Sequence, residues 1–149
     1  MNRMTTFALV VAALVGLACN GGAGGQAPAN WCAVNADNPH KSSSGAKKGI
    51  DQIIGKGWFK CTKSPEEVTL YVALQQKMQS GWVDVATARP RTFAWPRAGR
   101  NSDQVPAVLQ GCTDGRFRTA AKITGRDDNG RPGASDWAYS REVVNPCKT

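Results

Sequence analysis

The sequence lacks most of the residue combinations on which small enzymes and metal sites depend. It has a single histidine, His40, no GxSxG segment and no CxxC pair of the kind typical of zinc sites. Its longest apolar run, Phe7–Ala18, is shorter than the ~20 residues that a membrane-spanning helix needs. It also has no internal repeat and no segment with the apolar periodicity of an amphipathic helix. We therefore predict no metal and no cofactor.

Length and charge then narrow the class of protein. A chain of 149 residues is typical of one domain and is too short for a large barrel enzyme, which needs about 250 residues. Hydrophobic residues make up 41% and charged residues 20%, so a folded core is expected. Lys and Arg number 19 against 11 Asp and Glu, for a formal net charge of +8. This balance favours anionic partners.

Residues 1–29 have the pattern of a targeting segment, and residues 30–149 that of a single domain. Arg3 precedes the apolar run Phe7–Ala18, as in a secretory signal peptide. The Gly-rich stretch Asn20–Gln26 would not continue a helix. Ala27–Ala29 offers an A-x-A cleavage site, and Gly16–Ala18 offers a nearer small-x-small site. We expect a secreted, extracellular protein.

A lipid-anchored protein is the alternative. Gly16–Cys19 resembles a bacterial lipoprotein leader, although Gly16 stands where Leu is usual. The resemblance implies that Cys19 would be lipidated and that Asn20–Ala29 would form a flexible tether. The chain would then meet the membrane only through this anchor, on the outer surface of the cell.

The domain retains four cysteines, an even number that predicts two disulfides in a small exported domain. In an antiparallel hairpin, the positions of opposed residues average to the centre of the turn. The first two cysteines average to a position in Ser44–Lys47, and the last two to the centre of Asn129-Gly130, both turn-like. The alternative is interlocked pairing across two sheets. We predict the pairs Cys32–Cys61 and Cys112–Cys147.

Strand patterns dominate the domain. In Val68–Leu74 the apolar residues alternate and share one face. Arg116–Thr124 alternates too, with Phe117, Thr119, Ala121 and Ile123 on one face and Arg116, Arg118 and Lys122 on the other. We predict further strands or turns at Ile50–Ile54, Trp58–Cys61, Met78–Gly81 (a turn), Gly81–Ala88, Asp127–Gly130 (a turn) and Trp137–Val144. These short strands indicate an all-β antiparallel sandwich.

The last third of the chain carries a resemblance. Gly115–Gly125, a polar turn and Tyr139–Val144 resemble the final hairpin of fibronectin type III and related immunoglobulin-like domains. The resemblance implies an immunoglobulin-like sandwich of about six or seven strands. The domain also resembles small secreted β-sandwich proteins of actinobacteria, most of unassigned function. Neither resemblance implies a catalytic residue, because a fold does not define a function.

The most distinctive segment is Ala88–Arg100, which holds four arginines and no acid. Two aromatic residues are interleaved among the arginines, and two prolines stiffen the segment. Arginine binds phosphate and carboxylate in a bidentate manner, and aromatic rings stack on bases or sugars. Alternatively, the aromatic residues fill the core while the arginines remain solvated. The candidate ligand-binding residues are Arg89, Arg91, Phe93, Trp95, Arg97 and Arg100.

The remaining tryptophans are interpreted as structural, because a small sandwich needs large aromatic side chains in its core. We predict core packing for Trp58, Trp82 and Trp137, and a half-exposed Trp31 at the start of the first strand.

Two function classes remain open. A binding module is preferred over an enzyme, with acidic polysaccharide, teichoic acid, nucleic acid or another protein as its partner and a monomer as its state. The alternative is a small secreted hydrolase such as a ribonuclease. Its candidate residues are His40 as acid or base, Glu66 and Glu67 as bases, and Arg116 or Arg118 as phosphate clamps.

Overall fold

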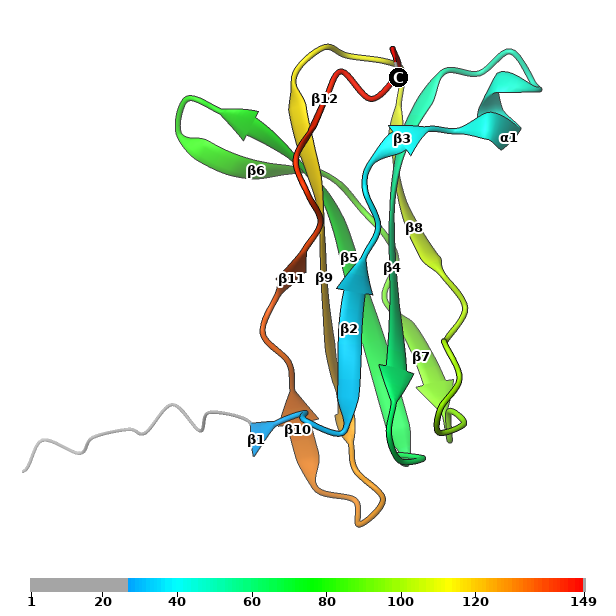
Figure 1. Cartoon of the computed structure of the whole chain (residues 1–149), viewed down its shortest axis with the longest axis vertical. Helices are drawn as coiled ribbons and strands as arrows, with labels where there is room; N and C mark the ends of the chain where they lie inside the picture. Colours follow the sequence, from blue (N-terminus) through cyan, green and yellow to red (C-terminus); the bar gives the residue numbers. More distant parts are fainter. Residues whose placement is uncertain (1–26, 149) are drawn as a thin grey trace, which may run out of the picture.

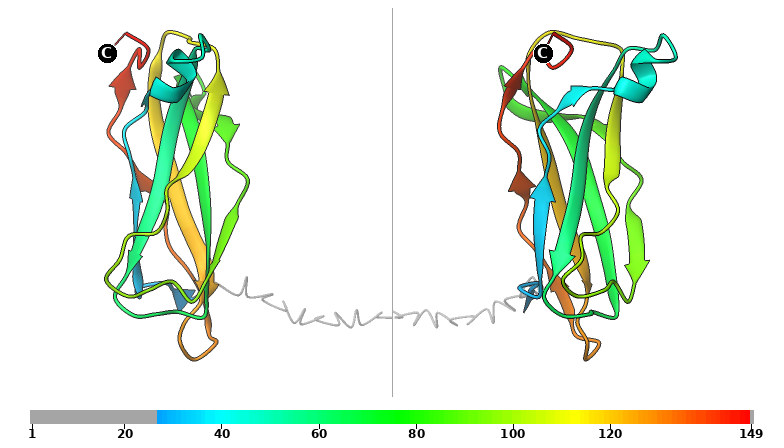
Figure 2. Two further views of the ribbon diagram at one scale, coloured as in Figure 1. Left: turned by 90° about the vertical axis from the view of Figure 1, so that its right-hand side faces the viewer. Right: turned by 45° about the vertical axis from the view of Figure 1, so that its right-hand side comes forward.

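The computed structural model describes residues 27–148 as two β-sheets, with their longer strands running along the long axis of the molecule (Figures 1 and 2). In chain order the elements are β1 Ala27–Pro28, β2 Cys32–Ala36, β3 His40–Lys41, α1 Ser43–Ala46, β4 Gln52–Cys61, β5 Glu67–Met78, β6 Gly81–Thr87, β7 Arg91–Ala94, β8 Val105–Gln110, β9 Arg116–Arg126, β10 Pro132–Ala134, β11 Ala138–Tyr139 and β12 Val143–Val144. The predicted all-β class is confirmed.

The larger sheet is built on β5 and β9, which pair antiparallel from Glu67↔Arg126 to Gln76↔Phe117. The other edge of β5 pairs with β6 and then with β7. The other edge of β9 pairs in succession with β10, β11 and β12, and β1 adds to β10 in parallel. The β5–β6 hairpin projects from the body at the same end as α1 and the C-terminus (Figure 1).

The smaller sheet is centred on β4. One edge of β4 pairs with β2 and β3, and the other edge pairs with β8. Between β3 and β4 the chain turns through α1, whose first turn is capped by Ser42: its Oγ accepts a hydrogen bond from the N–H of Gly45 at 3.0 Å. The turn-like stretch expected at Ser44–Lys47 is therefore a single helical turn.

The core lies between the inward faces of the two sheets, as the alternating patterns predict. The four alternating apolar residues of Val68–Leu74 are at most 2% exposed, and so are their counterparts in β9. On the opposite sheet, β4 turns Ile53, Gly55, Gly57 and Phe59 inward. The two glycines allow side chains of the larger sheet to approach the β4 backbone closely, since a β-carbon on Gly57 would lie 2.6 Å from Val72.

Both predicted disulfides are present, Cys32–Cys61 and Cys112–Cys147. Cys32 lies directly opposite Cys61 in the β2–β4 ladder. The second bridge joins the segment after β8 to the C-terminal tail, on either side of the β9–β10 hairpin, whose turn spans Asp127–Arg131. Disulfides of this kind are typical of proteins in an oxidising compartment.

Several strands differ from their predicted extents. Ile50–Ile54 and Trp58–Cys61 belong to one continuous strand, β4. The strand predicted at Trp137–Val144 is divided into two short strands, β11 and β12. The pairing with β9 is interrupted before and after β11, and at each interruption the register shifts by one residue. The strands β1, β3, β7, β8 and β10 were not individually predicted.

The segment Ala27–Ala29 is part of the sheet. Ala29 is 4% exposed, and its N–H donates to the carbonyl of Ala134 at 2.8 Å. Cleavage after Ala29 would therefore remove β1, whereas processing near Cys19 would retain it. The predicted leader, Cys19 included, otherwise lies outside the described residues. Among residues 27–148, no helix is long and apolar enough to cross a bilayer.

Candidate binding surfaces

The segment Ala88–Arg100 runs along the free edge of β5 and then crosses between the two sheets at the end opposite α1 (Figure 1). Its backbone is anchored at several points: the N–H of Ala88 donates to Val72 O at 2.9 Å, and that of Gly99 donates to Cys61 O at 2.8 Å. Residues 91–94 form β7. The segment is thus held on both sheets.

The middle of the segment is structural. Phe93 packs edge-to-face on Phe59, with ring centroids 5.1 Å apart, and so joins the core. The guanidinium of Arg91 lies 4.8 Å from the centroid of the Phe93 ring and 2.8 Å from Asp103 Oδ2. Phe93 and Arg91 therefore brace the loop rather than face a ligand freely.

Trp95 has the opposite placement. Its side chain is 61% exposed, the largest exposure among the large hydrophobic residues of the described chain. Its backbone has φ +48°, in the left-handed region that bulky residues rarely adopt. The N–H of Trp95 donates to Glu66 O at 2.9 Å, which holds this conformation. A strained, exposed indole is a feature that folding alone does not require.

A hollow of about 200 Å³ is lined by Phe93, Pro96, Arg97, Arg100, Asn101, Ser102 and Asp103. Trp95 is the chain neighbour of Pro96 but does not itself line the hollow. The guanidinium groups of Arg97 and Arg100 are exposed and make no hydrogen bond or ion pair within residues 27–148. The hollow's single acid, Asp103, is already paired with Arg91. Arg89 is also exposed and unpaired, but does not line the hollow.

The residues considered for a ribonuclease are dispersed. Arg116 lies ten positions along β9 from Arg126, the residue opposite Glu67, which is ~33 Å in an antiparallel strand. Arg116 instead pairs with Glu142 at 3.1 Å. His40 lies in the other sheet, where its Nδ1 is 3.1 Å from the carbonyl oxygen of Asn38. These groups do not form one catalytic constellation.

Asp127 orders the β9–β10 turn. Its Oδ1 accepts hydrogen bonds from the N–H groups of Asn129 and Arg131, and its Oδ2 accepts one from Arg131 Nε at 2.9 Å. The backbone N–H of Arg131 is the main cause that lowers the pKa of Asp127. Across the described part of the chain, no three His, Cys, Asp or Glu side chains are grouped so as to hold a metal ion.

The predicted core packing of the tryptophans is wrong. Trp137 is 39% exposed, and Trp82 is half-buried on the outer face of the larger sheet. Trp58 is also half-buried, and its indole N–H donates to Asp37 at 2.9 Å. The half-exposed position expected of Trp31 is confirmed. Smaller residues of β4, β5 and β9 fill the core, so that the tryptophans remain near the surface.

Six aromatic and cationic side chains gather on the outer face of β6, β5, β9 and β11. We call this surface the ladder face; its members are Tyr71, Trp82, Arg118, Lys122, Trp137 and Tyr139. Sequence analysis missed it as a unit. Alternation had placed Arg118 and Lys122 on the face away from the core, but their aromatic neighbours come from strands distant in sequence.

The ladder face has two rungs. In the first, the Arg118 guanidinium lies between two rings, 4.4 Å from the centroid of Trp82 and 3.9 Å from that of Tyr139. In the second, the Lys122 ammonium lies 4.8 Å from the centroid of Trp137 and 5.5 Å from that of Tyr71. All four distances are typical of cation–π contacts.

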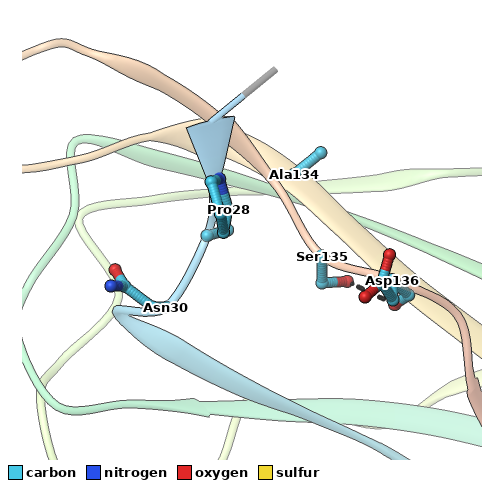
Figure 3. A pocket seen from close by; sticks show the side chains of 6 residues that line it. Pro28, Asn30, Ala134, Ser135 and Asp136 are labelled. Carbon is cyan, nitrogen blue, oxygen red and sulfur yellow. Dashed lines mark hydrogen bonds between the residues drawn. The ribbon is translucent and has the colours of Figure 1, made fainter. Parts of the chain in front are cut away.

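A larger hollow, of about 440 Å³, lies where the described chain begins (Figure 3). It is lined by Pro28, Ala29, Asn30, Ala134, Ser135 and Asp136. The Ser135 hydroxyl is engaged by its neighbours, since it donates to Asp136 O at 2.8 Å and accepts from the N–H of Ile123. The lining offers one carboxylate and no cation or aromatic ring, so its size alone indicates no ligand.

The chain matches no protein-family model, and a comparison with curated proteins finds no match.

Proposed function

We propose that the chain is a secreted or surface-tethered, immunoglobulin-like binding module that holds an anionic polymer against Ala88–Arg100. The observation that carries this proposal is that the guanidinium groups of Arg97 and Arg100, unpaired within the described residues, line one hollow, in the same segment as the exposed Trp95. The net charge of +8 adds long-range attraction for a polyanion.

The chemistry of the loop suits a chain of anionic units better than a small buried ligand. The hollow is small and open, and its two free guanidinium groups can each form bidentate contacts with a carboxylate, sulfate or phosphate. Trp95, in the same segment, offers a flat apolar surface on which a sugar or base can stack. Because the backbone is anchored on both sheets, little conformational entropy is lost on binding.

The test is the salt dependence of binding to an immobilised sulfated polysaccharide (heparin). The variant Arg97→Ala/Arg100→Ala should elute at clearly lower salt, and the slope of log affinity against log salt should fall by about one for each lost contact. Trp95→Ala should weaken binding without changing this slope, because the indole carries no charge.

The matched control is Lys47→Ala/Lys48→Ala. It removes the same charge from exposed side chains beside α1, at the other end of the molecule. If net charge alone governs retention, the two double variants will elute together, and Ala88–Arg100 is not the site.

A further inference from the structure

We propose that the ladder face is a second binding surface, separate from Ala88–Arg100, and that it takes a linear polysaccharide whose sugars carry carboxylates. It lies on the outer face of the larger sheet and carries four aromatic rings, all of which are at least partly exposed. Tyr139 is 49% and Trp137 39% exposed, although folding normally removes such rings from water. Exposed apolar groups gathered on one face mark interaction sites more often than chance.

Arg118, the cation of the first rung, is held in a fixed position in which it can bind an anion. Two rings lie close to the Arg118 guanidinium, and its Nε donates to Gln75 Oε1 at 2.7 Å. Gln75 is held in turn, because its Nε2 donates to Asp84 Oδ1 at 2.8 Å. The outer nitrogens of Arg118 make no hydrogen bond within the described chain, and a carboxylate can accept from both.

The face has unneutralised positive charge. Lys77, which lies 5.5 Å from the Trp82 ring centroid, Arg118 and Lys122 have no ion-pair partner among the described residues. Asp84 is the acid beside them, and its Oδ1 is used by Gln75. The charge of the face is therefore complementary to a ligand with carboxylates, and the rings limit the competing hydration of the cations.

The spacing of the rungs requires an extended ligand. Arg118 lies opposite Gln75, and Lys122 lies opposite Tyr71, so the rungs are four residues apart along both strands. At the rise of a β-strand this is ~13 Å. Between them, Ala73 faces Ala120 on the same outer surface. Both alanines are buried, at 2% and 0% exposed, so a ligand that reaches both rungs would lie over the side chains of the rungs and not on the strand backbone.

Sugars fit this surface better than a nucleic-acid backbone does. The apolar faces of sugar rings stack on aromatic side chains. The sugar hydroxyls can hydrogen-bond to the second carboxylate oxygen of Asp84 and to the threonine pair Thr69–Thr92, which lies beyond the second rung. The proposal stands whether or not Ala88–Arg100 binds a polymer.

The experiment measures binding of defined oligogalacturonates to the mature protein by calorimetry. Lys122→Gln and Trp137→Ala should each weaken binding about tenfold or more, while circular dichroism shows that the fold is retained. The matched control, Lys60→Gln, removes one charge from the exposed face of β4 on the other sheet and should leave affinity unchanged. Lys122→Gln and Trp137→Ala should lose as much affinity in an Arg97→Ala/Arg100→Ala background as in the native protein, which separates this site from the loop.

Three results would overturn the proposal. One is the absence of oligogalacturonate binding by the native protein, which would leave the ladder as a brace of the sheet. Another is equal binding by the ladder variants and the native protein. The third is equal affinity of the Arg97→Ala/Arg100→Ala protein for oligogalacturonate and for single-stranded DNA of similar length, because the ladder face would then recognise charge without regard to sugars.

Discussion

Thr119 of β9 lies across the interior of the sandwich from Gly55 of β4, where a β-carbon would stand 2.5 Å from Thr119 Oγ1. Thr119 is fully buried, and its hydroxyl oxygen has no hydrogen-bond partner within the described residues. The core therefore contains, between the two sheets, a polar group that has lost its water without gaining another partner among these residues. This one contact leads to two predictions about stability.

Thr119→Val should raise the free energy of unfolding by about 1 kcal/mol, because it replaces an unsatisfied buried hydroxyl with a methyl group of similar size. Urea denaturation monitored by tryptophan fluorescence measures the change. Thr69→Val is the matched control: the Thr69 hydroxyl lies 2.9 Å from that of Thr92, so this variant should lose stability. A Thr119→Val protein less stable than the native one would show that the hydroxyl is satisfied in solution.

Gly55→Ala should lower the free energy of unfolding by about 1–3 kcal/mol, because the new methyl group would overlap the Thr119 side chain. The test is a double-mutant cycle. With Thr119→Ala in the background, the two nearest contacts, to Thr119 Oγ1 and Cγ2, disappear, and the next one is Leu74 Cδ1 at 3.2 Å. Gly55→Ala should then cost less. Equal costs in both backgrounds would mean that the overlap with Thr119 is not the cause.

At position 95, glycine should be more stable than alanine. In an ordinary strand glycine is the less stable of the two by about 0.5–1 kcal/mol, but the φ of +48° at Trp95 reverses the order. We expect the free energy of unfolding of Trp95→Gly, measured by urea denaturation, to be about 1 kcal/mol higher than that of Trp95→Ala. Both variants should bind heparin more weakly than the native protein. The usual order, alanine above glycine, would show that the left-handed conformation is not kept.

Low pH should remove the contribution of Asp127 to the stability of the folded protein. The pKa of Asp127 is lowered from its ordinary value of 3.8, first by the backbone N–H of Arg131 and further by that of Asn129. A carboxyl group with a lowered pKa in the folded state stabilises the protein above the unfolded-state value, and this contribution is lost as the pH falls through the folded-state pKa.

The stability gap between the native protein and Asp127→Asn should therefore be full at pH 6 and narrow below pH ~4. Asp128→Asn, which removes the neighbouring and more exposed carboxylate, should show a smaller gap. Thermal unfolding between pH 2 and pH 6 measures both. A gap that does not change with pH would mean that ionised Asp127 has no special role in the turn.

Local sequence patterns were enough for the main strands and the disulfides. Alternation identified the inward faces of β5 and β9, because a strand that buries one face repeats every two residues. The turn at Asn129-Gly130 also placed Cys112 and Cys147 on opposite arms of one hairpin, since register in a hairpin follows from its turn. These features depend on the two-residue repeat of a strand and on the position of a turn, both of which are visible in the sequence.

The fate of each aromatic residue was decided by the tertiary structure. Phe93 and Trp95 are two positions apart, yet one packs on Phe59 and the other is exposed, because the chain leaves the regular alternation at a residue with positive φ. The two rungs of the ladder face join side chains from four strands of the larger sheet. The contacts between these side chains depend on which strands are neighbours in the sheet and on their register. Neither can be predicted from a local sequence pattern.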